Sequence, residues 1–324
     1  RPDLRRDAVG AEQAAVEDAW KTLPKYEYGQ DMAALLKIDG AVIDAMATPE
    51  SRESCAARLA RLLSSDQTTL AARHYICLKL REIGRWSPST SHLMIEAMRR
   101  GYAQRALHLG DADFVSIDPK LWSPEYAKAL GASIDSEKAT PSSELGPPIT
   151  ESPESDETTH FSVVDANGMA VSNTYTLEAG YGSGVVVRGA GFLLNNEMGD
   201  FNARPGVTNA RGTIGTAPNL IEPEKRMLSS MTPTIVTRDG EVVLVTGSPG
   251  GRTIINTVFC VTMNVLEFEM NIRDAVDAPR LDHEWFPERV RFMNADDEPY
   301  TEITEALRQM GHDVRASTGQ GDAN

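Results

Sequence analysis

The stretch TTHFSVVDANGMAVSNTYTL, residues 158–177, decides the fold class of this chain. Apolar and polar side chains alternate on both sides of the turn sequence Ala166-Asn167-Gly168. Alternation with a period of two, interrupted by a turn, is typical of a β-hairpin. The segment before it, residues 139–157, contains four prolines, five acidic residues and no basic one. That composition predicts an exposed, flexible linker that ends where the hairpin begins.

Residues 1–84 are predicted to form a separate helical segment. A helix is expected over 48–63, with Thr48 as its N-cap and Pro49 at its first position. A second is expected over 68–84, with Gly84 as its C-cap. Two helices joined by a short polar turn form a helical hairpin, and the pattern is similar to HEAT-type repeats.

Helices are also predicted over 89–109 and 123–130, within a second helical region that spans 85–138. Beyond the linker, residues 232–247 predict another hairpin, with Asp239-Gly240 as a type I′ turn. A mostly apolar helix is expected over 253–270, buried between layers. Hairpins combined with buried helices predict an α+β sandwich.

Composition excludes several functional classes. The net charge of −15 over 324 residues argues against a nucleic-acid partner or an anionic membrane surface. The three cysteines and six histidines show no metal-ligand spacing, so neither a metal nor a cofactor is expected, and Cys260 is predicted to be a core residue. No apolar run reaches the length of a membrane span, and no signal peptide is recognised. The chain begins with Arg1 rather than Met, which leaves the localisation open.

The threonine pair Thr158-Thr159 has two interpretations. Threonine favours β-strands, so a pair at the start of a strand is common without any function. A threonine hydroxyl becomes a nucleophile when a base lies beside it, and an N-terminal threonine carries that base as its own α-amine. The pKa of such an amine, about 7.7–8.0, suits a general base. An internal threonine gains the amine only if the bond before it is cut, and a flexible linker ending there provides that layout.

Four motifs in order, TTHFSVVDANGMAVSNTYTL, GFLLNNEMGDF, LSSMTPTIV and VTGSPGG, resemble the γ-glutamyltransferase (γ-glutamyltranspeptidase) family of N-terminal nucleophile hydrolases. The resemblance covers about residues 85–324 and includes EAMRRGYAQRALHLGDADF (96–114) from the family's large subunit. It implies an αββα sandwich for 158–324, a partial large subunit over 85–138, and a chain shortened at both ends. It also implies self-cleavage between Glu157 and Thr158 into two subunits, and a periplasmic or extracellular location.

The same resemblance implies roles for individual residues. Thr158 would be the nucleophile that attacks γ-glutamyl amides such as glutathione, and the glutamyl group would pass to water or to an amino acid. Thr176 would hydrogen-bond the nucleophile, and the N–H groups of Gly250 and Gly251 would form the oxyanion hole. His160 is expected to be structural rather than a base. The substrate-binding residues implied are Glu178, Glu197 and Asp200, with Ser229 and Ser230.

Two features leave alternatives open. Glu178 stands where many members of the family have Asn, and a carboxylate facing the donor's carboxylate would repel it unless it is protonated or turned away. An acylase of related type with a different donor is therefore one alternative. The shortened chain is also compatible with an inactive remnant, or with a helical interaction module at 1–84 that carries a passenger domain.

Overall fold

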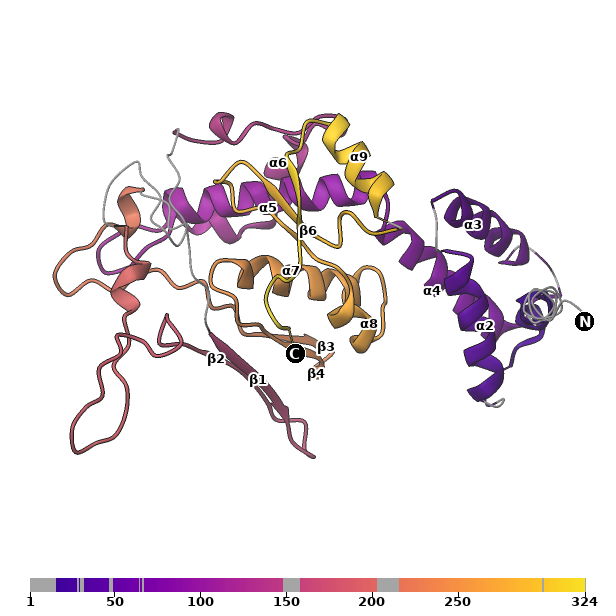
Figure 1. The fold of residues 1–324 in the computed structure, drawn as a ribbon, viewed down its shortest axis with the longest axis horizontal. Helices are drawn as coiled ribbons and strands as arrows, with labels where there is room; N and C mark the ends of the chain where they lie inside the picture. The colour runs from indigo at the N-terminus through magenta and orange to yellow at the C-terminus, as the bar shows by residue number, and fades with distance from the viewer. Residues whose placement is uncertain are drawn as a thin grey trace, which may run out of the picture.

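The computed structural model describes residues 16–27, 29, 32–46, 49–63, 65, 67–147, 158–202, 216–298 and 300–323. Helices combine with two two-stranded sheets and one three-stranded sheet in this part of the chain, which confirms the predicted α+β class. Figure 1 shows the N-terminal helices at one end and the remaining elements arranged around the helices α5 and α7.

The N-terminal helices have a hydrophobic cluster of their own, in which Trp20, Leu23, Leu59 and Ile76 are buried. Its elements are helical residues 16–22, η1 (Leu23–Lys25), α2 (Met32–Asp44), α3 (Pro49–Leu63) and α4 (Leu70–Arg85). The helices α3 and α4 pack against each other as the predicted helical hairpin. The predicted cap Thr48 lies outside the described residues. The HEAT-like character of the hairpin stays a prediction.

The prediction that Gly84 caps α4 is wrong, because the helix continues through Gly84 to Arg85. A tertiary contact holds this last turn. The Arg85 side chain is fully buried, its Nε donates to Asn264 Oδ1 at 2.8 Å, and its guanidinium lies 4.3 Å from the centre of the Trp86 ring. A long-range contact of this kind overrides the weak local preference of glycine for helix ends.

The helix α5 (Pro88–His108) runs through the centre of the molecule (Figure 1). It begins at Ser87, whose Oγ accepts a hydrogen bond from the Thr90 N–H at 3.1 Å, and Pro88 fits the first helical position. The short elements η2 (Pro119–Trp122) and α6 (Pro124–Ala132) follow. The ends of α5 and α6 lie within one or two residues of the predicted helix ends.

Residues 139–147, the first part of the predicted linker, are anchored to the core at Ala139 and Ser142, which are buried, while four of the nine residues are exposed as predicted. They include η3 (Ser142–Glu144). Ser142 is fully buried, and its Oγ donates to the Trp285 carbonyl at 2.6 Å. The Trp285 indole N–H donates back to the Ser142 carbonyl at 2.8 Å. The prediction of a linker with no contact to the core is therefore wrong for this part, and residues 148–157 lie outside the described residues.

Both predicted hairpins are present. Strands β1 (Thr159–Val164) and β2 (Ala170–Tyr175) pair antiparallel, as do β3 (Thr234–Arg238) and β4 (Glu241–Thr246). Asp239 and Gly240 have φ angles of 54° and 88°, as a type I′ turn requires. Ser172 joins the hairpins, because its Oγ donates to the Thr246 carbonyl at 2.9 Å and accepts from the Thr234 N–H at 3.1 Å.

The helix α7 (Thr253–Leu266) follows β4 and packs on it. The helix ends at Leu266, four residues before its predicted end at residue 270. Glu269, within the range predicted to be helical, has a left-handed φ of 53°. Cys260 on α7 is fully buried, as predicted. The remaining elements are α8 (Ile272–Asp277), β5 (Leu281–Asp282), β6 (Val290–Met293), α9 (Thr301–Gln309) and β7 (Val314–Ser317). Strand β6 lies between an antiparallel β5 and a parallel β7.

The main core lies between α5, α7 and this three-stranded sheet. Its buried members are Met94, Ile95, Met98, Cys260, Leu281, Val290, Phe292, Ala295, Ile303, Leu307 and Val314. Among the described helices, none is both long and apolar enough to cross a membrane.

Candidate functional site

The first hairpin brings the two predicted threonines together. Thr159 pairs with Tyr175, so Thr158 precedes β1 directly beside Thr176, which follows β2. Their Oγ1 atoms are 3.5 Å apart. Thr158 is half-buried. The predicted cleavage partner Glu157 lies outside the described residues.

Glu178 and Asn196 hold Thr176 in place. The Glu178 N–H donates to Thr176 Oγ1 at 2.8 Å. Glu178 has a φ of 75°, a left-handed conformation that is costly for a residue other than glycine. Asn196 fixes it from the other side, because its Nδ2 donates to Glu178 Oε2 at 2.7 Å and its Oδ1 accepts from the Ala179 N–H at 3.1 Å. One oxygen of the Glu178 carboxylate is thus held by Asn196.

The VTGSPGG segment lies against the strand that Thr158 begins. A Cβ atom at Gly247 would lie 2.0 Å from the His160 ring, so only glycine permits this contact. Gly250 and Gly251 have φ angles of 126° and 55°. Their carbonyls accept from the N–H groups of Thr253 and Ile254 in the first turn of α7, at 3.1 and 3.3 Å. No described residue accepts from the Gly250 or Gly251 N–H groups, which leaves them available for an anion beside a helix N-terminus.

His160 has a structural place, as the sequence interpretation held. One ring nitrogen is 2.7 Å from Thr174 Oγ1 and the other is 3.1 Å from Ser162 Oγ. Burial lowers the pKa of His160. The lowered pKa favours the neutral form of the ring, which packs against Gly247.

Glu197 and Asp200 lie together in the short turn η4 (Glu197–Asp200). Burial raises the pKa of Glu197 to about 7, and the neighbouring Asp200 carboxylate adds to the shift. Burial also raises the pKa of Asp200, against the opposing charge of Arg105. A buried and a half-buried carboxyl group with raised pKa values can together bind a cation, which would relieve their repulsion.

We expect the Glu197→Gln variant to be more stable than the wild type at pH 8, by about 1–3 kcal/mol. Glutamine keeps the shape and can donate to Asp200, but it cannot ionise. Because the folded-state pKa of Glu197 is raised, its favourable contribution is complete below pH ~4.5 and is lost as the pH rises through 7. Urea unfolding at pH 5 and pH 8 measures this, and a variant that loses stability equally at both pH values would contradict the raised pKa.

Two residues that the sequence interpretation missed connect this turn to the serines. Asn219 is buried, donates through Nδ2 to the Asp200 carbonyl at 2.7 Å, and accepts from the Leu228 N–H at 3.0 Å. Arg105 on α5 donates through Nη2 to the Ser229 carbonyl at 3.0 Å and to Ser230 Oγ at 3.1 Å. The sequence carried no signal for Asn219, whereas Arg105 lies in the quoted large-subunit motif without a role.

The site is therefore continuous. Thr158 contacts Thr176, Thr176 is linked through Glu178 and Asn196 to the turn that carries Glu197, and Asn219 joins that turn to the Ser229 segment. All predicted site residues except Glu157 are described, and these links bring together the residues from the first three motifs. The Gly250 segment reaches the site through the contact between Gly247 and His160.

The sequence model of the gamma-glutamyltranspeptidase family matches residues 58–324. The chain belongs to the gamma-glutamyltranspeptidase family. The match begins within α3, whereas the sequence motifs had indicated a resemblance from about residue 85 onward.

Two relatives are glutathione hydrolase proenzymes. One, from Pseudomonas aeruginosa, is 46% identical over 222 residues, which cover 68% of this chain and 39% of that protein. The other, from Escherichia coli K12, is 46% identical over 213 residues, which cover 65% of this chain and 37% of that protein.

This gamma-glutamyltranspeptidase family member thus spans less than two fifths of the length of those two relatives. Among solved structures, cephalosporin acylase from Bacillus halodurans superposes with a TM-score of 0.59 at 23% identity, covering 76% of this chain and 44% of that one. That likeness shows a shared fold.

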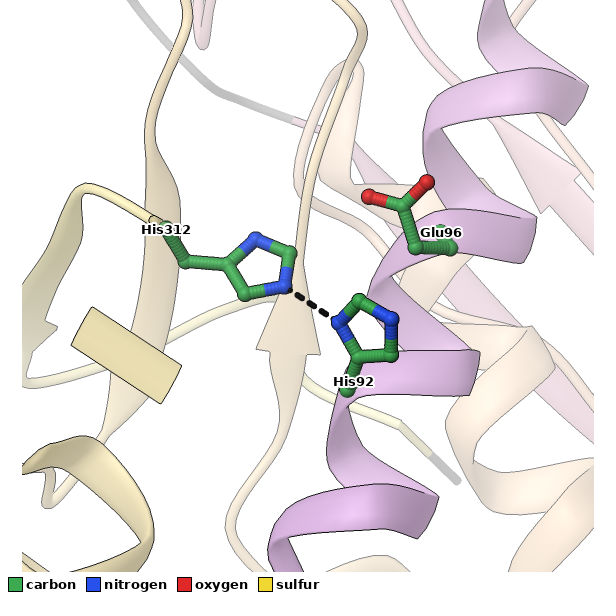
Figure 2. A group of neighbouring side chains, drawn as sticks. All are labelled: His92, Glu96 and His312. Atoms are coloured by element: carbon green, nitrogen blue, oxygen red, sulfur yellow. Dashed lines mark hydrogen bonds between the residues drawn. The ribbon is translucent and has the colours of Figure 1, made fainter. Parts of the chain in front are cut away.

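A second cluster of ligand-type side chains, His92, Glu96 and His312, lies in the core of this family member (Figure 2). His92 Nε2 is 2.7 Å from the Asp135 carbonyl and must donate to it. His92 Nδ1 therefore accepts from His312 Nε2 at 2.8 Å. His312 Nδ1 in turn accepts from Arg99 Nη2 at 3.3 Å.

Glu96 is occupied as well. It pairs with Arg99 at 3.3 Å and with Arg100, and it accepts from the Thr140 N–H at 3.1 Å. Every ring nitrogen of His92 and His312 and both Glu96 oxygens thus have protein partners. With two guanidinium groups beside them, these residues are poor ligands for a metal cation and form a structural network.

This network predicts a loss of stability in acid. Burial, followed by the charge of Arg99, lowers the pKa of His312 to about 3. A histidine whose pKa is lowered on folding stabilises the protein fully above pH ~6.5, and the contribution is lost as the pH falls toward 3. We expect His312 to account for a loss of about 2 kcal/mol in unfolding free energy between pH 7 and pH 5.

Urea unfolding of the wild type and the His312→Gln variant at both pH values tests this. His283 is also buried with a lowered pKa, so the variant is expected to keep a smaller dependence on pH rather than none. Equal pH dependence in the two proteins would contradict the assignment.

Proposed function

We propose that this chain cuts itself before Thr158 and then acts as a γ-glutamyltransferase and hydrolase with the freed Thr158 as its nucleophile. The observation that carries the proposal is the placement of Thr158 Oγ1 3.5 Å from Thr176 Oγ1, at the start of a strand. Family membership over residues 58–324 supports it.

Self-cleavage would begin when Thr158 Oγ attacks the carbonyl carbon of Glu157. The peptide C–N bond breaks as the new C–O bond forms, and the nitrogen takes a proton to become the α-amine of Thr158. Water then hydrolyses the ester. Glu157 becomes the carboxyl end of one subunit, and Thr158 becomes the amino end of the other.

In turnover, the α-amine of Thr158 would take the proton from its own Oγ as Oγ attacks the γ-carbonyl of the donor. The negative oxygen of the tetrahedral intermediate would accept hydrogen bonds from the Gly250 and Gly251 N–H groups. Collapse expels the amine, which leaves with a proton. Water or the amino group of an acceptor then attacks the γ-glutamyl ester and restores the Thr158 hydroxyl.

The surroundings suit the two charged ends of a γ-glutamyl group. The Glu197–Asp200 pair would bind its α-ammonium group, and the hydroxyls of Ser229 and Ser230 would bind its α-carboxylate. The hydrogen bond from Asn196 Nδ2 to Glu178 Oε2 would partly offset the negative charge that Glu178 presents to the α-carboxylate. The role of Glu178 would be to hold Thr176 through the hydrogen bond from its N–H to Thr176 Oγ1.

The test compares two isomers of one substrate. We expect release of 4-nitroaniline from L-γ-glutamyl-4-nitroanilide, and none above background from the α-glutamyl isomer, in which the scissile carbonyl carries the amino group on its neighbouring carbon. Glycylglycine as an acceptor is expected to raise the rate. Equal turnover of both isomers would contradict γ-glutamyl specificity, and turnover of neither would contradict the activity.

A further inference from the structure

Arg252 follows the two glycines of the proposed oxyanion hole, and the reaction proposed above gives it no role. Its side chain is buried, and it stands directly before α7. Gly250 and Gly251 have φ angles of 126° and 55°, which residues other than glycine rarely adopt. A glycine pair is the least restrained kind of backbone, whereas donors for an oxyanion must be held in place before the reaction starts. The neighbours of the pair must therefore supply the restraint.

The guanidinium of Arg252 is fixed in a turn that lies further along the chain. Nη2 donates to the carbonyls of Glu284 and Phe286, at 3.0 and 3.2 Å. Nη1 lies 3.3 Å from Glu284 Oε2, and both side chains of this ion pair are buried. A planar guanidinium that meets two carbonyls and a carboxylate at once is held in one orientation, which fixes the residue that carries it.

The backbone of Arg252 is held as well. Its carbonyl accepts a hydrogen bond from the hydroxyl of Tyr102 on α5, and the guanidinium lies 5.6 Å from the centre of the Tyr102 ring. At the other end of the glycine pair, Ser248 Oγ accepts from the Asp322 N–H at 2.9 Å and donates to the Pro249 carbonyl at 2.6 Å. The glycine pair thus lies between two tethered residues.

Part of this support comes from the chain before the proposed cut. Tyr102 belongs to that part, and so does Ser142, which exchanges two hydrogen bonds with Trp285 in the turn that holds Arg252. The Ser142 N–H also donates to Glu288 Oε2 at 2.6 Å. The turn is therefore anchored to the first piece of the chain, although the glycine pair lies in the second.

We infer that Arg252 is a positioning residue for the oxyanion hole, and that the Tyr102 hydroxyl positions Arg252 in turn. The inference rests on the proposed function for what the two glycine N–H groups do. Arg252 touches no reacting atom in that reaction, but it sets where the Gly250 and Gly251 N–H groups point. It follows that cutting the chain before Thr158 leaves the hole complete only while the two pieces stay joined.

The kinetics of four variants test this role. Arg252→Lys keeps the charge but loses the fork of donors, and Tyr102→Phe removes one hydroxyl. Their matched controls are Arg273→Lys, in an exposed ion pair on α8, and Tyr126→Phe on α6, whose hydroxyl donates to Gln104 Oε1 at 2.7 Å. For each variant, kcat and KM for L-γ-glutamyl-4-nitroanilide are measured per molecule of cut protein.

We expect kcat to fall about 10- to 100-fold in Arg252→Lys and about 3- to 10-fold in Tyr102→Phe, because contacts to the oxyanion form only as the transition state is reached. KM is expected to change less than about threefold, because other residues would bind the charged ends of the donor. Thermal melting shows whether each variant is folded, and Tyr102→Phe decides alone if Arg252→Lys is not. Folded variants with the kcat of their controls, or with a rise in KM alone, would overturn the inference.

A second readout needs no turnover. Spectra of protein that carries isotopically labelled glycine report the Gly250 and Gly251 N–H groups, each assigned by the loss of its signal on replacement with alanine. Tyr102→Phe is expected to shift or broaden both signals and to leave that of Gly168, in the turn of the first hairpin, unchanged. Tyr126→Phe is expected to change none of the three. Unchanged Gly250 and Gly251 signals in Tyr102→Phe would contradict the positioning role.

The failure of this inference and that of the proposed reaction are distinguishable. A wild type that releases no nitroaniline, but whose two glycine signals respond to Tyr102→Phe, fails the reaction alone. A wild type that turns over, but whose kcat and glycine signals are untouched by Tyr102→Phe, fails the inference alone.

Discussion

Replacing Thr158 by alanine is expected to abolish both self-cleavage and release of nitroaniline from the γ-glutamyl substrate, by a factor of about 10⁴ or more. Alanine removes the only oxygen that the proposed mechanism uses to form a covalent bond. Thr158 is half-buried and precedes β1, so the fold is expected to change little, within about 0.5 kcal/mol.

The matched control is Thr158→Ser, which keeps a hydroxyl at the same place and is expected to cleave itself more slowly but measurably. Gel analysis of cleavage, nitroaniline release and circular dichroism are measured on all three proteins. If Thr158→Ala retained the wild-type activity while folded, the nucleophile would have to be another residue.

Replacing Gly250 by alanine is expected to lower turnover by about 10²- to 10³-fold and to destabilise the protein by about 1–3 kcal/mol. The φ of 126° is one that side chains rarely allow, and a Cβ there would lie 2.6 Å from Thr253 Oγ1 and 2.9 Å from Gly321 Cα. The N–H group would have to move away from the oxyanion position. The variant is assayed at a temperature where circular dichroism shows it to be folded.

Gly319→Ala is the control for this variant. It lies two residues from Gly321, and an added Cβ would meet no atom within 4 Å. We expect it to retain nearly full activity. A folded Gly250→Ala variant as active as Gly319→Ala would show that the 250–251 segment does not serve as the oxyanion hole.

The parts of the fold that local sequence controls could be predicted. Strand alternation and the Asp239-Gly240 turn predicted both hairpins, because a type I′ turn needs positive φ angles that glycine and aspartate tolerate. The Thr158–Thr176 contact follows directly from the first hairpin, since residues that flank paired strands must meet.

Long-range contacts account for what the sequence could not predict. Gly84 stays helical because the neighbouring Arg85 side chain donates a hydrogen bond to Asn264, which lies 179 positions further along the chain. Residues 139–147 are anchored to the core because Ser142 and Trp285 exchange two hydrogen bonds, a contact that the composition of the segment does not indicate.

The supporting residues of the site show the same limit. Asn196, Asn219 and Arg105 act through partners from other segments, and none of them has a spacing or pattern of its own that indicates a function. Arg105 meets the serines 124 and 125 positions along the chain. Only the fold reveals that the Glu178 carboxylate accepts a hydrogen bond from Asn196.

Intact mass spectrometry of the purified wild-type chain over time tests the central claim most directly. The account predicts that the 35.3 kDa species is replaced by two pieces, residues 1–157 and 158–324, whose masses sum to that of the chain plus one water. The amino end of the second piece would be Thr158. A chain that stays whole through prolonged incubation, or that is cut at another bond, would contradict the proposal that this threonine is freed to become the nucleophile.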